Sequence, residues 1–264
     1  MRRLAVAIVL AALASPASAG AQGWQPDVAG AAAWAAQRQG SVTFAVRTAD
    51  TLSGRGLDRQ VPTASVLKAM LMTAYLRRAT VRDRPLGAGD RALLRPMIRR
   101  SDNVTATRVR DIVGNGALVR LARRSSMTHF AVNPVWGLSL TTARDQTQFF
   151  LGLEQLLPDR HRGYALRLLR NIVPSQRWGM GQTIPAGWTL HFKGGWGSGT
   201  GAVDHQVGLL RRGEDRVAIA VMTTGNPSHA YGKATLEGVS RRLMSGLAPV
   251  GAVGPSERAA QFSR

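Results

Sequence analysis

The sequence predicts a mixed α/β fold of the α+β kind, in which strands from both ends of the chain build a sheet and the middle forms a helical lobe. Residues 41–49 (SVTFAVRTA) alternate apolar and polar side chains, as a half-buried strand does. Helical patterns fill most of residues 66–168, and strand patterns return in the last third of the chain. We therefore assign residues 24–62 and 187–248 to a sheet lobe and residues 63–186 to a helical lobe, with a cleft between them.

The first 19 residues have the pattern of an export signal. Two arginines precede an apolar stretch at residues 4–14, which is too short to span a bilayer, and small residues at 17–19 form a cleavage site. We expect a secreted, periplasmic or cell-envelope protein with one domain at residues 20–248. The Gly- and Pro-bearing tail at residues 249–264 is expected to be unstructured.

The elements of the first half follow from local patterns. An alanine-rich run predicts a helix at residues 28–37, and residues 51–56 predict a turn from the first strand into its partner. The almost wholly apolar run that follows Ser65 predicts a buried helix. Further helices are predicted at residues 92–100, 104–113 and 117–124, where Gly114 and Gly116 separate the last two.

The second half begins with a loop at residues 125–140, which contains Asn133-Pro134. The pair Thr141-Thr142 is typical of a helix cap and predicts a helix that runs to about residue 157. Strand patterns and a final helical pattern close the chain. They lie at residues 189–193, 203–210, 217–224 and 234–247, respectively.

Composition narrows the chemistry. The chain has no cysteine, which excludes disulfides, thiolate metal sites and thiol catalysis. Its net charge is +20, but the arginines occur in scattered pairs, which favours a solvated basic surface over a nucleic-acid site. Only three lysines occur beside 32 arginines, and two of them, Lys68 and Lys193, stand in short motifs. Because lysine can lose its proton in a protein and arginine cannot, these positions indicate proton transfer.

The first motif is Ser65-Val66-Leu67-Lys68. A serine in the first turn of a helix and a lysine three residues later lie on one face, about one turn apart. The helix amino terminus favours an oxyanion, and the apolar helix desolvates Lys68 and lowers its pKa. Ser65 is therefore a candidate nucleophile and Lys68 its candidate base, although a lone Ser-x-x-Lys pair is common.

Two further motifs complete a candidate site. In Ser101-Asp102-Asn103, the Ser101 hydroxyl is a candidate proton relay and Asn103 a candidate ligand of a substrate carbonyl, whereas a plain helix cap is the alternative. In Lys193-Gly194-Gly195, the glycines at the end of a strand would let a substrate lie alongside the backbone, whereas a strand that simply runs into a glycine loop is the alternative. The backbone N–H groups of Trp196 and Ser65 are candidates for an oxyanion hole.

In this order, the three motifs match the set Ser-x-x-Lys, Ser-Asp-Asn and Lys-Thr-Gly, with glycine in place of the threonine of the third. The chain therefore resembles class A β-lactamases and penicillin-binding proteins of the D,D-peptidase superfamily. The resemblance implies a five-stranded antiparallel sheet flanked by terminal helices, with an inserted helical lobe. It also implies Ser65 as acylated nucleophile, Lys68 as proton acceptor, Ser101 and Lys193 as a second relay, and Asn103 as substrate ligand.

The chain departs from this pattern in two places. Class A β-lactamases carry an omega-loop glutamate that activates water, whereas residues 104–150 contain only Asp111 and Asp145 as acids, so we expect weak turnover. Gly194 replaces a hydroxyl residue that helps to hold a substrate carboxylate in relatives. Ser198 and Thr200 on the same loop are candidate replacements, and plain turn hydroxyls are the alternative.

Other classes of site have weaker support. The five histidines lack metal-ligand spacing, and we expect no metal and no cofactor. In the implied fold, Arg177 would lie near the site rim and is a candidate ligand for an anionic substrate. We expect a monomer that acts on a small molecule or peptide of cell-wall type, with no membrane span. A D,D-peptidase and a non-hydrolytic envelope-binding protein remain the alternatives.

Overall fold

The computed structural model describes residues 24–247, so the predicted signal and the predicted tail lie outside the described residues. Within them, a five-stranded sheet has the order β2-β1-β7-β6-β5, and every neighbouring pair is antiparallel. The strands are β1 (Ser41–Arg47), β2 (Leu52–Arg55), β5 (Thr189–Gly197), β6 (Val203–Arg212) and β7 (Asp215–Thr224). The predicted mixed fold, with a sheet drawn from both ends of the chain, is confirmed.

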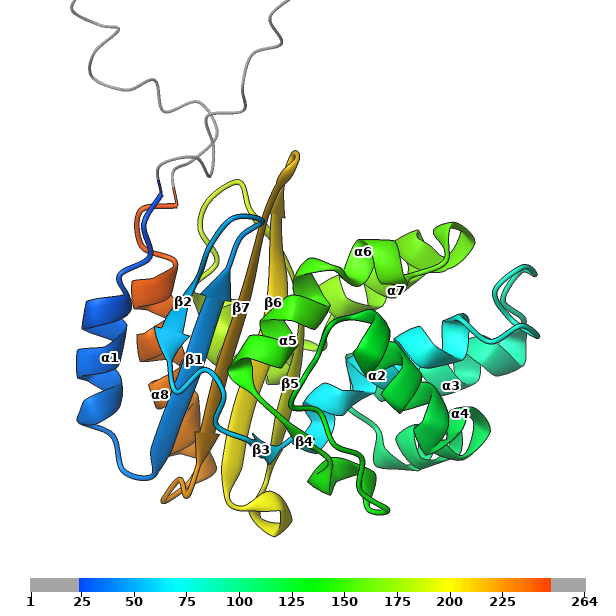
Figure 1. Cartoon of the computed structure of the whole chain (residues 1–264), viewed down its shortest axis with the longest axis horizontal. Helices are drawn as coiled ribbons and strands as arrows, with labels where there is room; N and C mark the ends of the chain where they lie inside the picture. The colour runs from blue at the N-terminus through cyan, green and yellow to red at the C-terminus, as the bar shows by residue number, and fades with distance from the viewer. Residues whose placement is uncertain (1–23, 248–264) are drawn as a thin grey trace, which may run out of the picture.

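Helices cover both faces of this sheet (Figure 1). Helices α1 (Val28–Ala36) and α8 (His229–Leu243) pack together on one face, and α5 (Ala143–Leu151) lies across the other. The remaining helices lie beyond β5 and form the helical lobe. They are α2 (Leu67–Leu76), α3 (Ala88–Arg99), α4 (Asn103–Arg124), α6 (Leu153–Leu156) and α7 (Asp159–Arg170).

Short elements connect the sheet with the helical lobe. A two-stranded sheet pairs β3 (Val61–Pro62) with β4 (Leu140–Thr141). Single 3₁₀ turns follow or precede the longer elements. They are η1 (Ala64–Val66), η2 (Trp136–Leu138), η3 (Pro174–Gln176), η4 (Gly179–Gln182) and η5 (Ser198–Thr200). The turn η1, which leads into α2, therefore directly follows the strand β3 of this small sheet.

Two boundaries in the sheet differ from the prediction. The predicted turn at residues 51–56 contains β2, because the chain already reverses at Thr48, whose amide donates to the Thr51 carbonyl (3.0 Å). A Cβ at Gly54 would lie 2.1 Å from the Phe44 carbonyl oxygen, so glycine serves a close strand pairing there and not a turn. Strand β5 also continues through the glycines to Gly197, because they pair with β6.

Helical boundaries differ as well. Helix α3 begins at Ala88, and the helix predicted to run to about residue 157 is divided into α5 and α6. Gly114 adopts a left-handed φ of 72° and kinks α4, where two helices were predicted. The predicted loop at residues 125–140 contains η2 and joins β4 at its end. Helix α8 begins at His229, five residues before the predicted start, because the Ser228 side chain caps it by accepting from the Tyr231 amide.

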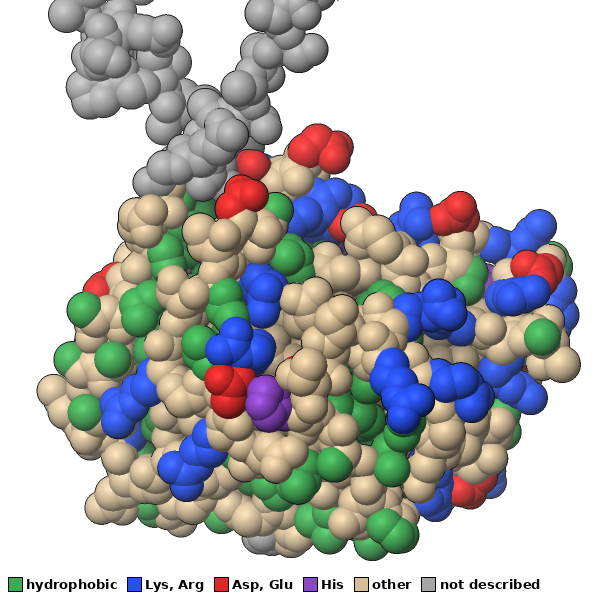
Figure 2. Space-filling view, in the orientation of Figure 1, with side chains coloured by type: hydrophobic (Ala, Val, Ile, Leu, Met, Phe, Trp, Pro, Cys, Tyr) green, Lys and Arg blue, Asp and Glu red, His purple; other side chains and the backbone are tan. Residues whose placement is uncertain are grey.

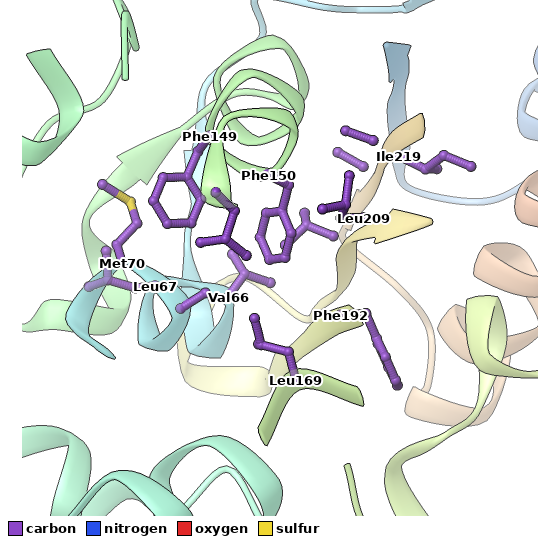
Figure 3. Packing of buried hydrophobic residues seen from close by; sticks show 14 of the residues in the cluster. Val66, Leu67, Met70, Phe149, Phe150, Leu169, Phe192, Leu209 and Ile219 are labelled. Carbon is purple, nitrogen blue, oxygen red and sulfur yellow. The ribbon is translucent and has the colours of Figure 1, made fainter. Parts of the chain in front are cut away.

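The hydrophobic core joins the sheet to the helical lobe (Figure 3). Phe149 and Phe150 of α5 pack edge to face, with ring centroids 5.5 Å apart, and lie above residues of η1 and α2. Every residue of α2 is buried, as expected for a helix that is apolar on all sides. A charged side chain placed in α2 is therefore cut off from water.

Basic side chains are unevenly shared between the lobes. Residues 63–186 contain 20 Lys and Arg against seven Asp and Glu, whereas residues 24–62 and 187–247 together contain 11 against seven. Figure 2 shows the blue side chains spread over the surface and interrupted by other types. No helix within residues 24–247 combines the length and apolar character that a membrane crossing needs.

His205 of β6 ties the sheet to the segment that leads into η1. Its Nδ1 accepts from the Thr223 amide (3.1 Å) and its Nε2 lies 2.9 Å from the Pro62 carbonyl oxygen, which assigns the proton to Nε2. The ring is fully buried, and burial lowers the pKa of His205 to about 4. The neutral ring therefore holds Pro62 three residues before Ser65.

We predict that His205 makes the protein acid-sensitive. Between pH 6.5 and 4 the unfolded chain binds a proton that the folded ring excludes, so the free energy of unfolding falls by about 3 kcal/mol as the pH drops through this window. Urea denaturation at several pH values measures it. In His205→Gln, the free energy of unfolding should change less over this pH range than in the wild type. In His129→Gln, which changes a half-exposed loop residue, it should change as in the wild type. Identical slopes for wild type and His205→Gln would contradict the assignment.

Candidate active site

Ser65 lies in η1, at the junction of β3 and α2. The Thr63 amide donates to the Ser139 carbonyl (2.7 Å), which ties η1 to the chain that follows η2. Ala64 has a left-handed φ of 43°, a conformation that a non-glycine residue adopts only when its surroundings enforce it. Ser65 is nine-tenths buried and lies in the middle of a 3₁₀ turn, whereas the prediction placed it in the first turn of the helix; α2 begins two residues later. The turn is thus fixed from both sides.

Strand β5 passes directly beside this turn at Gly195. A Cβ there would lie 2.8 Å from the Ser65 amide nitrogen and 2.9 Å from that of Val66. No side chain fits at such a distance, which is the physical reason for glycine at this position. The Ser65 amide therefore lies beside Gly195, and Trp196 is the next residue of β5. This approach brings Gly195 to the Ser65 turn, and the oxyanion hole formed by the amides of Ser65 and Trp196 stays a prediction.

Lys68 points from the buried helix α2 towards the start of α4. Its Nζ lies 2.5 Å from the Ser101 carbonyl oxygen, 3.2 Å from the Ser101 hydroxyl and 2.7 Å from Asn103 Oδ1. The Trp136 ring centroid is 5.0 Å away. Burial lowers the pKa of Lys68 to about 7, although the negative charge of Asp102 opposes the shift. Near neutral pH the amine thus exists in both its charged and its neutral form.

Ser101 is held in a strained position before α4. It has a left-handed φ of 58°. The next residue, Asp102, caps α4 by accepting from the amide of Thr105 (2.7 Å) and from its hydroxyl (2.7 Å). Asp102 therefore fixes the turn, while the backbone and side chain of Ser101 both face the lysines. Asn103 is exposed, and its side-chain oxygen Oδ1 accepts a hydrogen bond from Lys68.

Lys193 reaches the same hydroxyl from the opposite side. Its Nζ is 3.0 Å from the Ser101 hydroxyl and 2.6 Å from the Gly194 carbonyl oxygen. The side chain is fully buried. Burial, reinforced by the charge of Lys68, holds the pKa of Lys193 well below its usual range. Two amines from different lobes thus share one serine hydroxyl.

This arrangement is suited to proton transfer. A neutral Lys68 amine can accept a proton from a hydroxyl, and the Ser101 hydroxyl, placed between the two amines, can pass one on. Among residues 24–247 no hydrogen bond joins the Ser65 hydroxyl to Lys68, which lies one helical turn further along the chain. Catalytic hydrogen bonds commonly form only once the substrate is bound, so the open contact is compatible with this chemistry.

The carboxylates of the region are engaged outside the site. Asp145 is buried and accepts from the amides of Thr128 (3.0 Å) and His129 (2.9 Å), which anchors the loop before η2. Asp111 is exposed and pairs with Arg110 (2.8 Å). Within residues 24–247, no three His, Asp or Glu side chains are grouped so that they could hold a metal.

Two of the predicted anion ligands have partners of their own. Arg177 donates to the Arg170 carbonyl (2.9 Å) and lies over the Phe192 ring. Thr200 donates to the Gly197 carbonyl (3.2 Å) inside its own turn. Ser198 begins η5, beyond the end of β5.

Three residues that the motifs do not include also border the site. Trp136 forms a wall beside Lys68, and its indole nitrogen donates to Thr107 (3.2 Å). Trp178 faces Gly194, where an added Cβ would lie 3.5 Å from its ring. His229 stacks on Trp196. No local pattern marks these three, because each comes from a different part of the chain.

Comparison with known proteins agrees with this geometry. The model of the Beta-lactamase2 family, described as the beta-lactamase enzyme family, matches residues 90–247, more than half of the chain. The chain belongs to this family. The match includes Ser101 and Lys193 but starts after Ser65 and Lys68, so those two are carried by the motif and the geometry alone. Among curated proteins, none matches the sequence.

Solved structures show the same fold. The β-lactamase of Sphaerobacter thermophilus DSM 20745 has a TM-score of 0.73 at 19% identity, over 84% of this chain and 98% of that chain. An ancestral class A β-lactamase of Gram-negative bacteria has a TM-score of 0.71 at 18% identity, over 84% and 99%. A PBP-A mutant in an acyl-enzyme complex with penicillin G has a TM-score of 0.66 at 19% identity, over 82% and 93%. The β-lactamase-like fold is therefore shown, in agreement with the family to which the chain belongs.

We predict that acylation of this family member depends on the neutral form of Lys68. The acylation rate should rise as the pH passes through about 7 and level off above it, because the protonated amine cannot accept a proton. Lys68→Arg should slow acylation by about 10²- to 10⁴-fold, since guanidinium stays charged. Stopped-flow or quenched mass measurements follow the rate. Lys233→Arg, which changes the third lysine, is the matched control; equal rates for both variants would remove Lys68 from the mechanism.

Proposed function

We propose that this chain is an exported serine hydrolase that is acylated at Ser65 by a β-lactam or a related cell-wall amide. The observation that supports it best is the array Lys68–Ser101–Lys193, in which two desolvated amines share one hydroxyl beside the turn that carries Ser65. Burial of two amines is unfavourable for folding, so the stability of the fold does not explain why lysine occupies these two positions. Its chemical use is the removal and delivery of a proton.

In the proposed reaction, the Ser65 hydroxyl oxygen bonds to the carbonyl carbon of the substrate while its proton moves to Lys68. The carbonyl oxygen takes up negative charge and lies against the amides of Ser65 and Trp196. When the C–N bond breaks, the leaving nitrogen receives a proton from the Ser101 hydroxyl, which is replaced from Lys68 or Lys193. The product is an ester of Ser65 and a free amine. Asn103 and Gly195 border the bound substrate.

Hydrolysis of this ester is expected to be slow. A water molecule needs a base to attack the acyl-enzyme, and the two carboxylates of residues 104–150 hold other partners. The mass adduct should therefore persist after acylation. This behaviour would place the chain nearer to penicillin-binding proteins than to efficient β-lactamases.

Export is part of the proposal. Two arginines, a short apolar stretch and a small-residue cleavage site at residues 1–19 support it, and cell-wall substrates lie outside the cytoplasm. The proposed location is the periplasm, the cell envelope or the medium. Amino-terminal sequencing of the mature protein would test it.

We predict that incubation with penicillin G adds the mass of one penicillin to the protein and that Ser65→Ala abolishes this gain. Time-resolved intact-mass spectrometry reports both the gain and its decay. Ser175→Ala, which changes an exposed serine of η3, is the matched control and should behave as the wild type. Labelling that survives Ser65→Ala would exclude Ser65 as the nucleophile.

Assays of the small molecules, together with the mass of the protein, separate the alternatives. Release of D-alanine from a stem peptide without faster loss of a β-lactam would identify a D,D-peptidase, a function that the absence of a free loop carboxylate favours. No mass gain with penicillins or activated acyl probes would instead favour a non-hydrolytic envelope-binding protein with the same fold.

A further inference from the structure

A pocket with a basic lining lies between the ends of α3 and α7, the turn η3 and the start of β5. Its volume is about 470 Å³. Arginines line it from three elements: Arg99 from α3, Arg170 from α7 and Arg177 from the end of η3. Among the described residues, no Asp or Glu belongs to the lining. The pocket thus gathers three positive charges with no negative charge between them.

Two of these arginines are held on the pocket wall by backbone carbonyls at the end of α7. The Arg99 Nε donates to the Asn171 carbonyl (2.7 Å), and Arg177 donates to the Arg170 carbonyl (2.9 Å). Each bond uses one of the five N–H groups of a guanidinium, so the others can donate to a ligand. A side chain that is already held in place also loses less conformational entropy when a ligand binds.

The basic lining continues along α3 and α7, which pack against each other in the helical lobe (Figure 1). Arg91, Arg95 and Arg99 recur every four residues and therefore lie on one side of α3. Burial raises the pKa of Tyr164 in α7, and the charges of Arg91, Arg95 and Arg167 oppose this shift, which places all three near one side chain. We call the whole set the α3/α7 surface; it consists of Arg91, Arg95, Arg99, Arg167, Arg170 and Arg177.

The carboxylates on and around these helices pair with arginines outside the α3/α7 surface. Asp90, at the start of α3, and Asp159, at the start of α7, each have such a partner. Glu154 and Asp215 pair with arginines of β6 and β7. Within residues 24–247, the arginines of the α3/α7 surface therefore have no carboxylate partner, and their charge is available to an external anion.

We propose that the α3/α7 surface binds a linear, phosphate-bearing polymer of the cell envelope, with one phosphate in the pocket. The envelope as the source of the polymer rests on the proposed export, whereas the affinity for polymeric phosphate does not. A bound polymer keeps the protein at the cell wall, where the proposed substrates are.

The geometry favours phosphate on a flexible chain. Guanidinium groups that surround a pocket from three elements match the tetrahedral oxygens of phosphate, which accept hydrogen bonds from several directions. Arg91 and Arg99 are eight residues apart, about 12 Å along α3, so the row offers contacts to successive charges of an extended chain.

A single-stranded nucleic acid is a poorer match. Proteins bind its bases by stacking them on aromatic side chains. Here Tyr164 is covered by Arg91, whose guanidinium lies 5.2 Å from the ring centroid, and Trp188 in the pocket wall is buried. The α3/α7 surface therefore fits a polymer that presents phosphates without bases.

Binding of fluorescent poly(glycerol phosphate), measured by polarisation, tests the proposal. Salt of about 0.15 M screens distant charges. Arg170→Glu puts a carboxylate in place of a pocket guanidinium and should raise the Kd by about tenfold or more. Arg120→Glu, which makes the same change at an exposed position in the second half of α4, should stay within about twofold of the wild type. Equal losses in both variants would overturn the proposal, because net charge alone would then explain binding.

A second variant and two further polymers sharpen the test. Arg167→Glu, at an exposed position of α7, should also weaken binding more than Arg120→Glu, and thermal melts show that each variant is folded. Polyglutamate should bind more weakly than poly(glycerol phosphate); equal affinity would contradict a phosphate site. Duplex DNA that binds more tightly and loses as much affinity in Arg170→Glu would identify a nucleic-acid surface and overturn the envelope polymer.

Failure of this inference is distinct from failure of the proposed function. Ser65→Ala should bind poly(glycerol phosphate) as the wild type does. If penicillin adds no mass but the polymer binds as predicted, the hydrolase is wrong and the α3/α7 surface stands. If penicillin adds mass and Arg170→Glu binds the polymer like the wild type, only this inference is wrong.

Discussion

The burial of two lysine amines around one serine hydroxyl is the constraint on which the rest of the structure depends. Lys68 and Lys193 lie 3.2 and 3.0 Å from the Ser101 hydroxyl and are both fully buried. Burial of the charged amines opposes folding, and it lowers the pKa of both lysines. Arginine would keep its charge at these positions, so a chain rich in arginine retains lysine where a proton must leave.

The scaffold can be understood as the means of holding these amines in place. Helix α2 is buried on all sides and excludes water from Lys68, while β5 brings Lys193 from the other lobe. Gly195 lets β5 approach the Ser65 turn, and His205 ties that turn to the sheet. Ala64 and Ser101 have left-handed backbones, so the site has a strained residue next to Ser65 and another at Ser101.

Much of this could be predicted from the sequence where the pattern is local. The alternation of apolar and polar side chains predicted the first strand, and an apolar run predicted α2. The position of Lys68, three residues after Ser65, predicted that both lie on one face of a helix. The continuation of β5 through its glycines could not be predicted. It depends on pairing with β6, whereas glycine has a low strand propensity of its own. The pairing of β3 with β4 joins residues about 80 positions apart and likewise leaves no local signal.

The walls of the site were the hardest part to predict. Trp178, Trp196 and His229 come from a loop, a strand and the start of a helix, and each alone is typical of a packed core. Arg177 was expected at the rim, but its guanidinium donates to the Arg170 carbonyl at the end of α7. Such choices depend on tertiary packing, which motif spacing does not encode.

Titration of the lysine amines tests the central claim most directly. With only three lysines, a chain labelled with ¹³C at lysine Cε has three signals, and Lys68→Arg and Lys193→Arg assign two of them. The account predicts that the Lys68 signal titrates with a midpoint of about 7 and that Lys193 also titrates below its ordinary value. Midpoints for both at the ordinary value of about 10.4 would contradict it.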